Sequence, residues 1–89
     1  MRKPICKGYD IQLAQTFQNP PEVQYQFRCE PDGDDYHLLW PTASVRIEAE
    51  EVFVGFSWHE EPEDNATRLT LEASITAALL KTITEATNL

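Results

Sequence analysis

The segment VQYQFRCEPDGDDYHLLW, residues 23–40, decides the predicted fold. Apolar and polar side chains alternate over residues 23–30, which is the pattern of a strand with one buried face. Asp32-Gly33 is a preferred two-residue hairpin loop, because both central residues of a type I′ turn need a positive φ. We therefore expect residues 35–40 to return as the second strand of a hairpin, with the apolar residues on one face. The expected cross-strand pairs are Cys29 with Tyr36, Phe27 with Leu38, and Tyr25 with Trp40.

Two flanking segments extend this hairpin into a sheet. Alternation over residues 9–17 predicts another strand, whose apolar face includes Phe17. Pro20-Pro21 ends that strand, since proline has no N–H donor. A further alternating segment runs from about Ser44 to His59, and its parity changes after Glu50-Glu51. The change indicates either one long bent strand or two short strands, so we expect a four- or five-stranded antiparallel meander.

The C-terminal segment predicts a helix from about Leu71 to Ala86, with Thr70 as its N-cap. Six of its residues fall within about 140° of one another on a helical wheel, which gives the helix one apolar face. Leu80 lies on the opposite side, either as a singly exposed leucine or as a contact with another chain. We expect one α+β domain over residues 1–89, with the helix packed on the apolar face of the sheet. The helix residues predicted to face the sheet are Leu71, Ile75, Ala78, Leu79, Thr82 and Ile83.

The charge of the chain excludes two classes of partner. Its 89 residues include 15 Asp and Glu against 7 Lys and Arg, so the formal net charge is −8. Direct binding to nucleic acid or to an anionic membrane is not expected, because both rely on Lys and Arg. No apolar run is long enough for a signal sequence or a membrane span, which predicts a cytoplasmic protein. In that compartment Cys6 and Cys29 are expected to be thiols, with Cys29 packed as a small apolar residue.

No residue pattern predicts catalysis or a cofactor. The three glycines are far apart, so they form no phosphate-binding loop, and neither cysteine has the surroundings of a nucleophile. His37 and His59 each lie near carboxylates, which raises the hypothesis of a metal site. Their spacing matches no ligand motif, and two surface histidines are the simpler interpretation. We expect neither enzymatic activity, nor a metal, nor a cofactor.

The acidic residues gather in the middle of the chain. Eleven of the fifteen lie between residues 30 and 64, where Arg46 is the only Lys or Arg. They form three clusters: Glu30, Asp32, Asp34 and Asp35; Glu48, Glu50 and Glu51; and Glu60, Glu61, Glu63 and Asp64.

This charge pattern predicts a small acidic protein-binding module. We expect an inhibitor that docks an anionic face on the basic, nucleic-acid-binding surface of another protein, with carboxylates in place of phosphates. Small acidic anti-defence proteins of bacterial viruses, such as anti-CRISPR and anti-restriction proteins, are similar in size and charge, although no motif links the chain to one of their families. The expected partner-binding residues are Asp32, Asp34, Asp35, Glu60, Glu61, Glu63 and Asp64. Candidate aromatic anchors are Tyr36, Trp40, Phe53 and Trp58.

The alternative function is a self-associating structural or accessory module without catalytic activity. A homodimer would then form through an exposed sheet edge or through Leu80, and the charge would serve only solubility.

Overall fold

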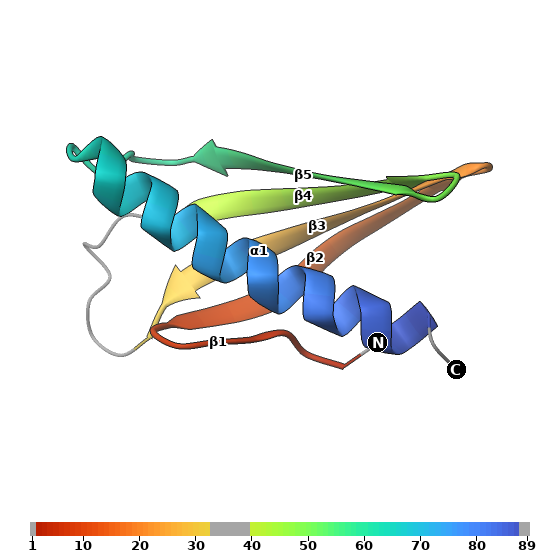
Figure 1. Cartoon of the computed structure of the whole chain (residues 1–89), viewed down its shortest axis with the longest axis horizontal. Helices are drawn as coiled ribbons and strands as arrows, with labels where there is room; N and C mark the ends of the chain where they lie inside the picture. The colour runs from red at the N-terminus through yellow and green to blue at the C-terminus, as the bar shows by residue number, and fades with distance from the viewer. Residues whose placement is uncertain (1, 33–39, 88–89) are drawn as a thin grey trace.

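The structure, a computed structural model, describes residues 2–32 and 40–87. Five strands precede one helix, and the strands form a single sheet in the order β1-β2-β3-β4-β5 with every neighbouring pair antiparallel (Figure 1). The predicted α+β class is confirmed, as a five-stranded antiparallel meander with a C-terminal helix. The elements are β1 (Ile5–Cys6), β2 (Tyr9–Asn19), β3 (Glu22–Pro31), β4 (Pro41–Glu48), β5 (Glu51–Trp58) and α1 (Asn65–Thr87).

The helix crosses one face of the sheet, which we call the inner face. Figure 1 shows α1 running diagonally, from the end of β5 towards the side of the sheet that carries β1. Of the six helix residues predicted to face the sheet, five are buried and Leu71 is half-buried, so the predicted apolar face is confirmed. The buried apolar core consists of Ile11, Phe27, Cys29, Ala43, Val45, Ile75, Ala78, Leu79 and Ile83.

The predicted partner of β3 is wrong. β3 pairs with β4, so Phe27 opposes Ala43 and Tyr25 opposes Val45. The expected pair of Tyr25 with Trp40 is therefore not formed, and the expected partners Leu38 and Tyr36 lie outside the described residues. The physical reason is the length of the ladder. Residues 41–48 pair with β3 as far as Glu22, whereas the six residues 35–40 would leave the start of β3 without a partner on this side.

The parity change after Glu50-Glu51 marks a tight turn between two strands. Glu48 opposes Glu51, which leaves Ala49 and Glu50 as a two-residue loop. The two short strands are confirmed, and the single long bent strand is wrong. Ala49 adopts a φ of 55°, a conformation that β-hairpin loops of this length need and that glycine adopts more readily than alanine.

A β-bulge in β2 changes the face on which its second half projects. The register between β2 and β3 shifts between Leu13 and Gln15, so one extra residue is inserted at this point. Phe17 therefore opposes Gln24 and lies on the outer face, away from the helix, which corrects the prediction that it shares the apolar face with Ile11. β1 was not predicted, because two residues are too few to show any periodicity.

The helix begins six residues earlier than predicted, and Asp64 caps it in place of Thr70. Oδ2 of Asp64 accepts hydrogen bonds from the backbone N–H of Thr67 at 3.2 Å and from its hydroxyl at 2.8 Å. The hydroxyl of Thr70 instead donates to the carbonyl of Ala66 at 2.9 Å, one turn earlier inside α1. Residues 66–70 are thus helical.

Candidate functional site

Two of the three acidic clusters lie at the same end of the sheet. β3 and β5 run in the same direction, since each is antiparallel to β4, so the residues that follow them emerge at one end. Pro31, at the end of β3, and Pro62, in the loop after β5, line the same cavity of about 370 Å³. We call this region the acidic end; its described carboxylates are Glu30, Asp32, Glu60, Glu61, Glu63 and Asp64, together with Asp10, which opposes Glu30 in the β2–β3 ladder and forms an ion pair with Lys3.

The carboxylates of the acidic end differ in how far they are already engaged. The Glu30 carboxylate forms an ion pair with Arg28 at 3.7 Å, whereas the hydrogen bond at Asp32 joins its backbone N–H, and not its carboxylate, to the carbonyl of Gly8 at 3.0 Å. The side chains of Glu60, Glu61 and Glu63 are exposed, and no ion pair joins them to another described residue. The predicted binding residues Asp34 and Asp35 lie outside the described residues.

Asp64 has a structural role at the start of α1. The hydrogen bonds from the hydroxyl and the backbone N–H of Thr67 lower the pKa of the Asp64 carboxyl below its ordinary value of 3.8. An N-cap carboxylate satisfies helix donors that would otherwise have no partner. Asp64 therefore fixes where the loop ends and the helix begins, and it is exposed at the rim of the acidic end.

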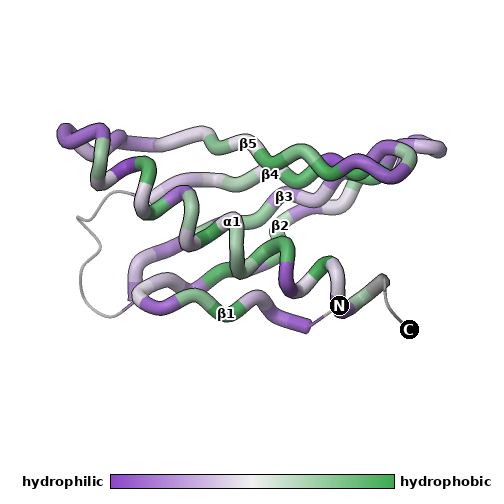
Figure 2. The backbone as a smooth tube through the Cα atoms, in the orientation of Figure 1, coloured by the Kyte–Doolittle hydropathy of each residue, from purple (hydrophilic) through white to green (hydrophobic). Residues whose placement is uncertain are grey.

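The third acidic cluster lies at the opposite end of the sheet. The turn between β4 and β5 carries Glu48, Glu50 and Glu51, and Glu22 joins this cluster because it opposes Glu48 across the β3–β4 ladder. The described part of the molecule extends 37 Å along its longest axis. Figure 2 shows hydrophilic backbone segments at both ends of this axis and apolar segments between them. The three clusters do not share one face, and the acidic surface is divided between two ends.

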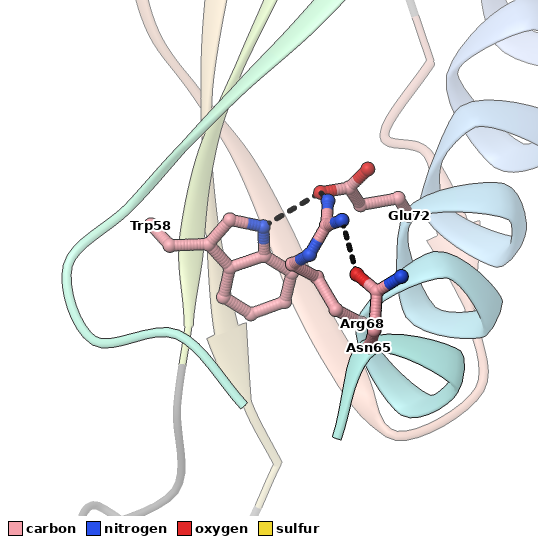
Figure 3. Close-up of polar contacts among 4 residues, drawn as sticks. All are labelled: Trp58, Asn65, Arg68 and Glu72. Carbon is pink, nitrogen blue, oxygen red and sulfur yellow. Dashed lines mark hydrogen bonds and ion pairs between the residues drawn. The ribbon is translucent and has the colours of Figure 1, made fainter. Parts of the chain in front are cut away.

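A hydrogen-bonded network anchors both sides of the loop that carries Glu60, Glu61 and Glu63 (Figure 3). The indole N–H of Trp58, just before the loop, donates to Oε2 of Glu72 at 2.8 Å. Arg68 donates to the same oxygen at 3.0 Å.

Arg68 also makes a hydrogen bond at the C-terminal end of this loop. Its second terminal nitrogen donates to Oδ1 of Asn65 at 2.5 Å, at the first residue of α1. The predictions from sequence did not include this network, although the four-residue spacing of Arg68 and Glu72 is the usual spacing of a helical ion pair. The network places Trp58 and the first turn of α1 in fixed positions on either side of residues 59–64.

The aromatic candidates are divided between the two ends. Trp40 stacks on His59 next to the acidic end, with ring centroids 5.4 Å apart and an interplanar angle of 22°. The backbone N–H of His59 also donates to the carbonyl of Trp40 at 3.3 Å. Phe53 instead lies on the outer face towards the opposite end, where the guanidinium of Arg46 sits 4.7 Å from its ring centroid. Tyr36 lies outside the described residues.

The residues singled out for metal binding do not form a site in the described part of the chain. Among residues 2–32 and 40–87, no group of three His, Cys, Asp or Glu side chains is placed to hold a metal ion. His59 is engaged by Trp40, and His37 lies outside the described residues.

The two cysteines are free thiols that pack on the same core. Cys29 is fully buried, which confirms its prediction as a small apolar residue, and Cys6 packs against the core while half-buried. Burial, with a smaller contribution from Cys6, raises the pKa of the Cys29 thiol to about 12. Burial also raises the pKa of Cys6. Neither thiol therefore has the lowered pKa that marks a reactive cysteine.

No protein-family model matches the chain, and comparisons with curated proteins and with solved structures found no match. In the part of the chain that the structure describes, no helix combines the length and apolar character that crossing a membrane requires.

Proposed function

We propose that the chain is a small, non-catalytic cytoplasmic protein that binds another protein by docking its acidic end on a Lys/Arg-rich surface. One observation carries the proposal. Pro31 and Pro62 are about thirty positions apart in sequence, yet they line one cavity, so the carboxylates next to each of them in sequence emerge at one end of the sheet. A concentrated negative surface of this kind steers a basic partner towards it and raises the rate of association.

The loop after β5 is suited to such binding because it is already ordered. Trp58 and Asn65 hold its two sides through Glu72 and Arg68. A loop whose backbone is already fixed loses little backbone entropy when its carboxylates meet a partner. A Lys/Arg-rich surface that binds phosphates also binds carboxylates, so the chain would compete with nucleic acid and act as an inhibitor. Anti-defence proteins of bacterial viruses are one such class.

The cavity supplies an apolar component beside these charges. Its lining includes the apolar or aromatic residues Tyr9, Pro31, Pro62 and Leu71, and it is completed by Lys7, Gly8 and Thr67. Binding energy in protein interfaces concentrates where an apolar side chain enters a pocket surrounded by polar contacts. We expect the partner to insert one apolar or aromatic side chain here while its cations face the surrounding carboxylates.

The test compares two triple charge reversals with the same effect on net charge. Glu60→Lys, Glu61→Lys and Glu63→Lys change the acidic end, and Glu22→Lys, Glu48→Lys and Glu51→Lys change the opposite end. Each triple moves the formal net charge from −8 to −2, since every substitution adds two charges. The partner is captured from an extract of the source cells at low salt and eluted with a salt gradient. Its affinity for each purified variant is then measured by calorimetry.

The proposal predicts a loss of affinity of at least about tenfold for the acidic-end triple, together with a weaker dependence on salt. The opposite-end triple should stay within about threefold of the unmodified chain. Equal losses in both triples would show that only net charge matters. No loss in the acidic-end triple would show that the acidic end is not the binding surface. Either result contradicts the proposal.

A further inference from the structure

The sheet has two edges, and they differ in how they are protected. β5 is the outermost strand on its side, and within the described residues its only strand neighbour is β4. From Val52 to Trp58 it has seven residues with no charge, no proline and no shift of register. Val52 and Phe53 are exposed by 41% and 43%. A regular, apolar, uncharged edge strand is a template for pairing with another strand.

The edge on the other side of the sheet, formed by β2, is protected from pairing by a bulge and by prolines, which β5 does not have. β1 covers Tyr9 and Asp10 of β2, and the rest of β2 has its edge free of other described strands. The bulge between Leu13 and Gln15 interrupts this free stretch, and Pro20-Pro21 follows it. Bulges and prolines are devices that prevent edge-to-edge pairing. The chain thus blocks pairing at one edge and permits it at the other.

We propose that β5 pairs antiparallel with β5 of a second copy of the chain, about a twofold axis at Gly55, to form a continuous ten-stranded sheet. This inference does not depend on the proposed binding of a basic partner, because it uses a different surface.

Symmetry and side-chain parity determine the register. In an antiparallel ladder, residues that oppose one another project on the same face of the sheet. A twofold axis between two copies of β5 must therefore pass between one residue and the same residue of the partner. Gly55 is the middle residue of the uncharged run, and an axis there pairs the whole run with itself. The resulting pairs are Val52 with the partner's Trp58, Phe53 with the partner's Ser57, and Val54 with the partner's Phe56.

Charge supports this register over its neighbours. An axis at Gly55 leaves every pair from Val52 to Trp58 without a charge, and Glu51 and Glu50 then fall opposite the partner's His59 and Glu60 outside this run. Moving the axis to Phe56 would place Val52 opposite the partner's Glu60, and moving it to Val54 would place Glu50 opposite the partner's Trp58. Both shifts bring a carboxylate into the apolar ladder, which costs free energy.

The same charges predict how the dimer responds to salt. Two chains of net charge −8 repel one another, and the Val52–Trp58 run lets them pair with no carboxylate inside the ladder, although Glu50 and the partner's Glu60 lie just beyond it. Added salt screens this repulsion, so it should strengthen the dimer. Binding of the acidic end to a basic partner should weaken with salt. The two associations can therefore be distinguished in solution.

The first experiment measures mass by sedimentation equilibrium from about 10 to about 500 µM chain, at low and high salt, a range suited to a weak interface. The expected result is a reversible dimer of about twice 10.2 kDa that becomes tighter with salt. A monomer over the whole range would overturn the proposal.

Three matched variants then locate the interface. Val52→Glu changes the β5 edge, Leu13→Glu the β2 edge and Leu80→Glu the outward face of α1, and each replaces a side chain that is 38–47% exposed. All three reach the same net charge of −9. Only Val52→Glu should raise the dimer dissociation constant, by at least about tenfold, because its carboxylate would be buried in the ladder. Loss of the dimer in either of the other two, with Val52→Glu still dimeric, would overturn the proposal.

A cross-linking experiment tests the register even if one of these variants folds poorly. A Cβ added at Gly55 would meet no atom within 4 Å, so Gly55→Cys should fold. In a Cys6→Ser background, oxidation with copper phenanthroline should cross-link Gly55→Cys across the axis. Ser57→Cys should not cross-link, because its equivalent would be about four residues away along the partner strand, or about 13 Å. Efficient cross-linking of Ser57→Cys without Gly55→Cys would overturn the register.

Discussion

The two halves of the sheet differ in what covers their inner face. Next to the acidic end, α1 lies over the strands, and Phe27 and Ala43 are fully buried beneath it. Towards the β2–β3 and β4–β5 turns, the helix diverges from the strands (Figure 1). There Val52 is 41% exposed although it projects on the same face. We call these the covered half and the turn half.

The comparison shows that alternation along a strand does not by itself bury the apolar residues. The pattern of β4 and β5 is continuous from one half to the other, yet only residues beneath the helix leave water completely. Stability should therefore depend on the covered half, since buried apolar area is the main favourable term in folding. The turn half, with its exposed edge strand and its glutamates, should tolerate substitution.

The largest expected difference between the halves comes from truncating one core side chain in each. Phe27→Ala should lower the free energy of unfolding by about 3–5 kcal/mol, because it removes a fully buried ring and leaves a cavity. Val52→Ala should cost less than about 1 kcal/mol, because the side chain already contacts water. Urea denaturation monitored by circular dichroism measures both. Similar losses would mean that the turn half is as important to stability as the covered half.

A smaller effect is expected from the network that joins α1 to the end of β5. Glu72→Ala removes the acceptor of both the Trp58 indole and Arg68, and it should cost about 1–2 kcal/mol. Glu85→Ala, at an exposed position near the end of the same helix, should change stability by less than about 0.5 kcal/mol. Thermal unfolding followed by tryptophan fluorescence distinguishes the two. A Glu72→Ala variant as stable as Glu85→Ala would contradict a stabilising role for the network.

In the turn half, one substitution should increase stability. Ala49 has a φ of 55°, where an alanine side chain is strained and glycine is not. Ala49→Gly should raise the free energy of unfolding by about 0.5–1 kcal/mol, after the larger chain entropy of unfolded glycine is subtracted. Glu50→Gly, next to it at a residue without positive φ, should lower stability. If Ala49→Gly were the destabilising member of this pair, the turn would not be strained.

The smallest effect concerns pH at the start of α1. The pKa of Asp64 is lower in the folded chain than its ordinary value of 3.8, because Thr67 donates to the ionised form. The unfolded chain therefore binds a proton first, and the stabilising contribution is present above this value and is lost as pH falls through the folded pKa. Asp64→Asn keeps a capping oxygen without titrating.

The stability difference between the unmodified chain and Asp64→Asn should therefore shrink as pH falls from about 5 to about 3. Melting temperatures measured across this range give the comparison. A difference that stays constant with pH would show that the Asp64 charge does not contribute.

The sequence predicted the features that repeat along the chain and missed those that depend on a single residue or on a distant partner. Alternation and the helical wheel were sufficient for the α+β class and for the buried face of α1. Asp32-Gly33 is a strong local turn signal, but the ladder between β3 and β4 satisfies more of the backbone than the short hairpin would. The bulge near Leu13 has no sequence signature, and it moved Phe17 to the outer face.

The same limit applies to the acidic end. Residues 60–64 were identified as acidic from composition, but their proximity to residues 30–32 depends on strand order. The predicted pairing of β3 with residues 35–40 was wrong, so the predicted order of the strands could not show that residues 30–32 and 60–64 lie at the same end of the sheet. The capping role of Asp64 was not predicted, because the helix was expected to start at Leu71.

The buried thiol of Cys29 can be used to measure how often the core opens. With a pKa of about 12 and no exposure, it has almost no thiolate at neutral pH and no access to a reagent. It can react only in molecules whose core has opened. In a Cys6→Ser chain, which removes the half-buried second thiol, its rate of labelling therefore reports the population of open chains.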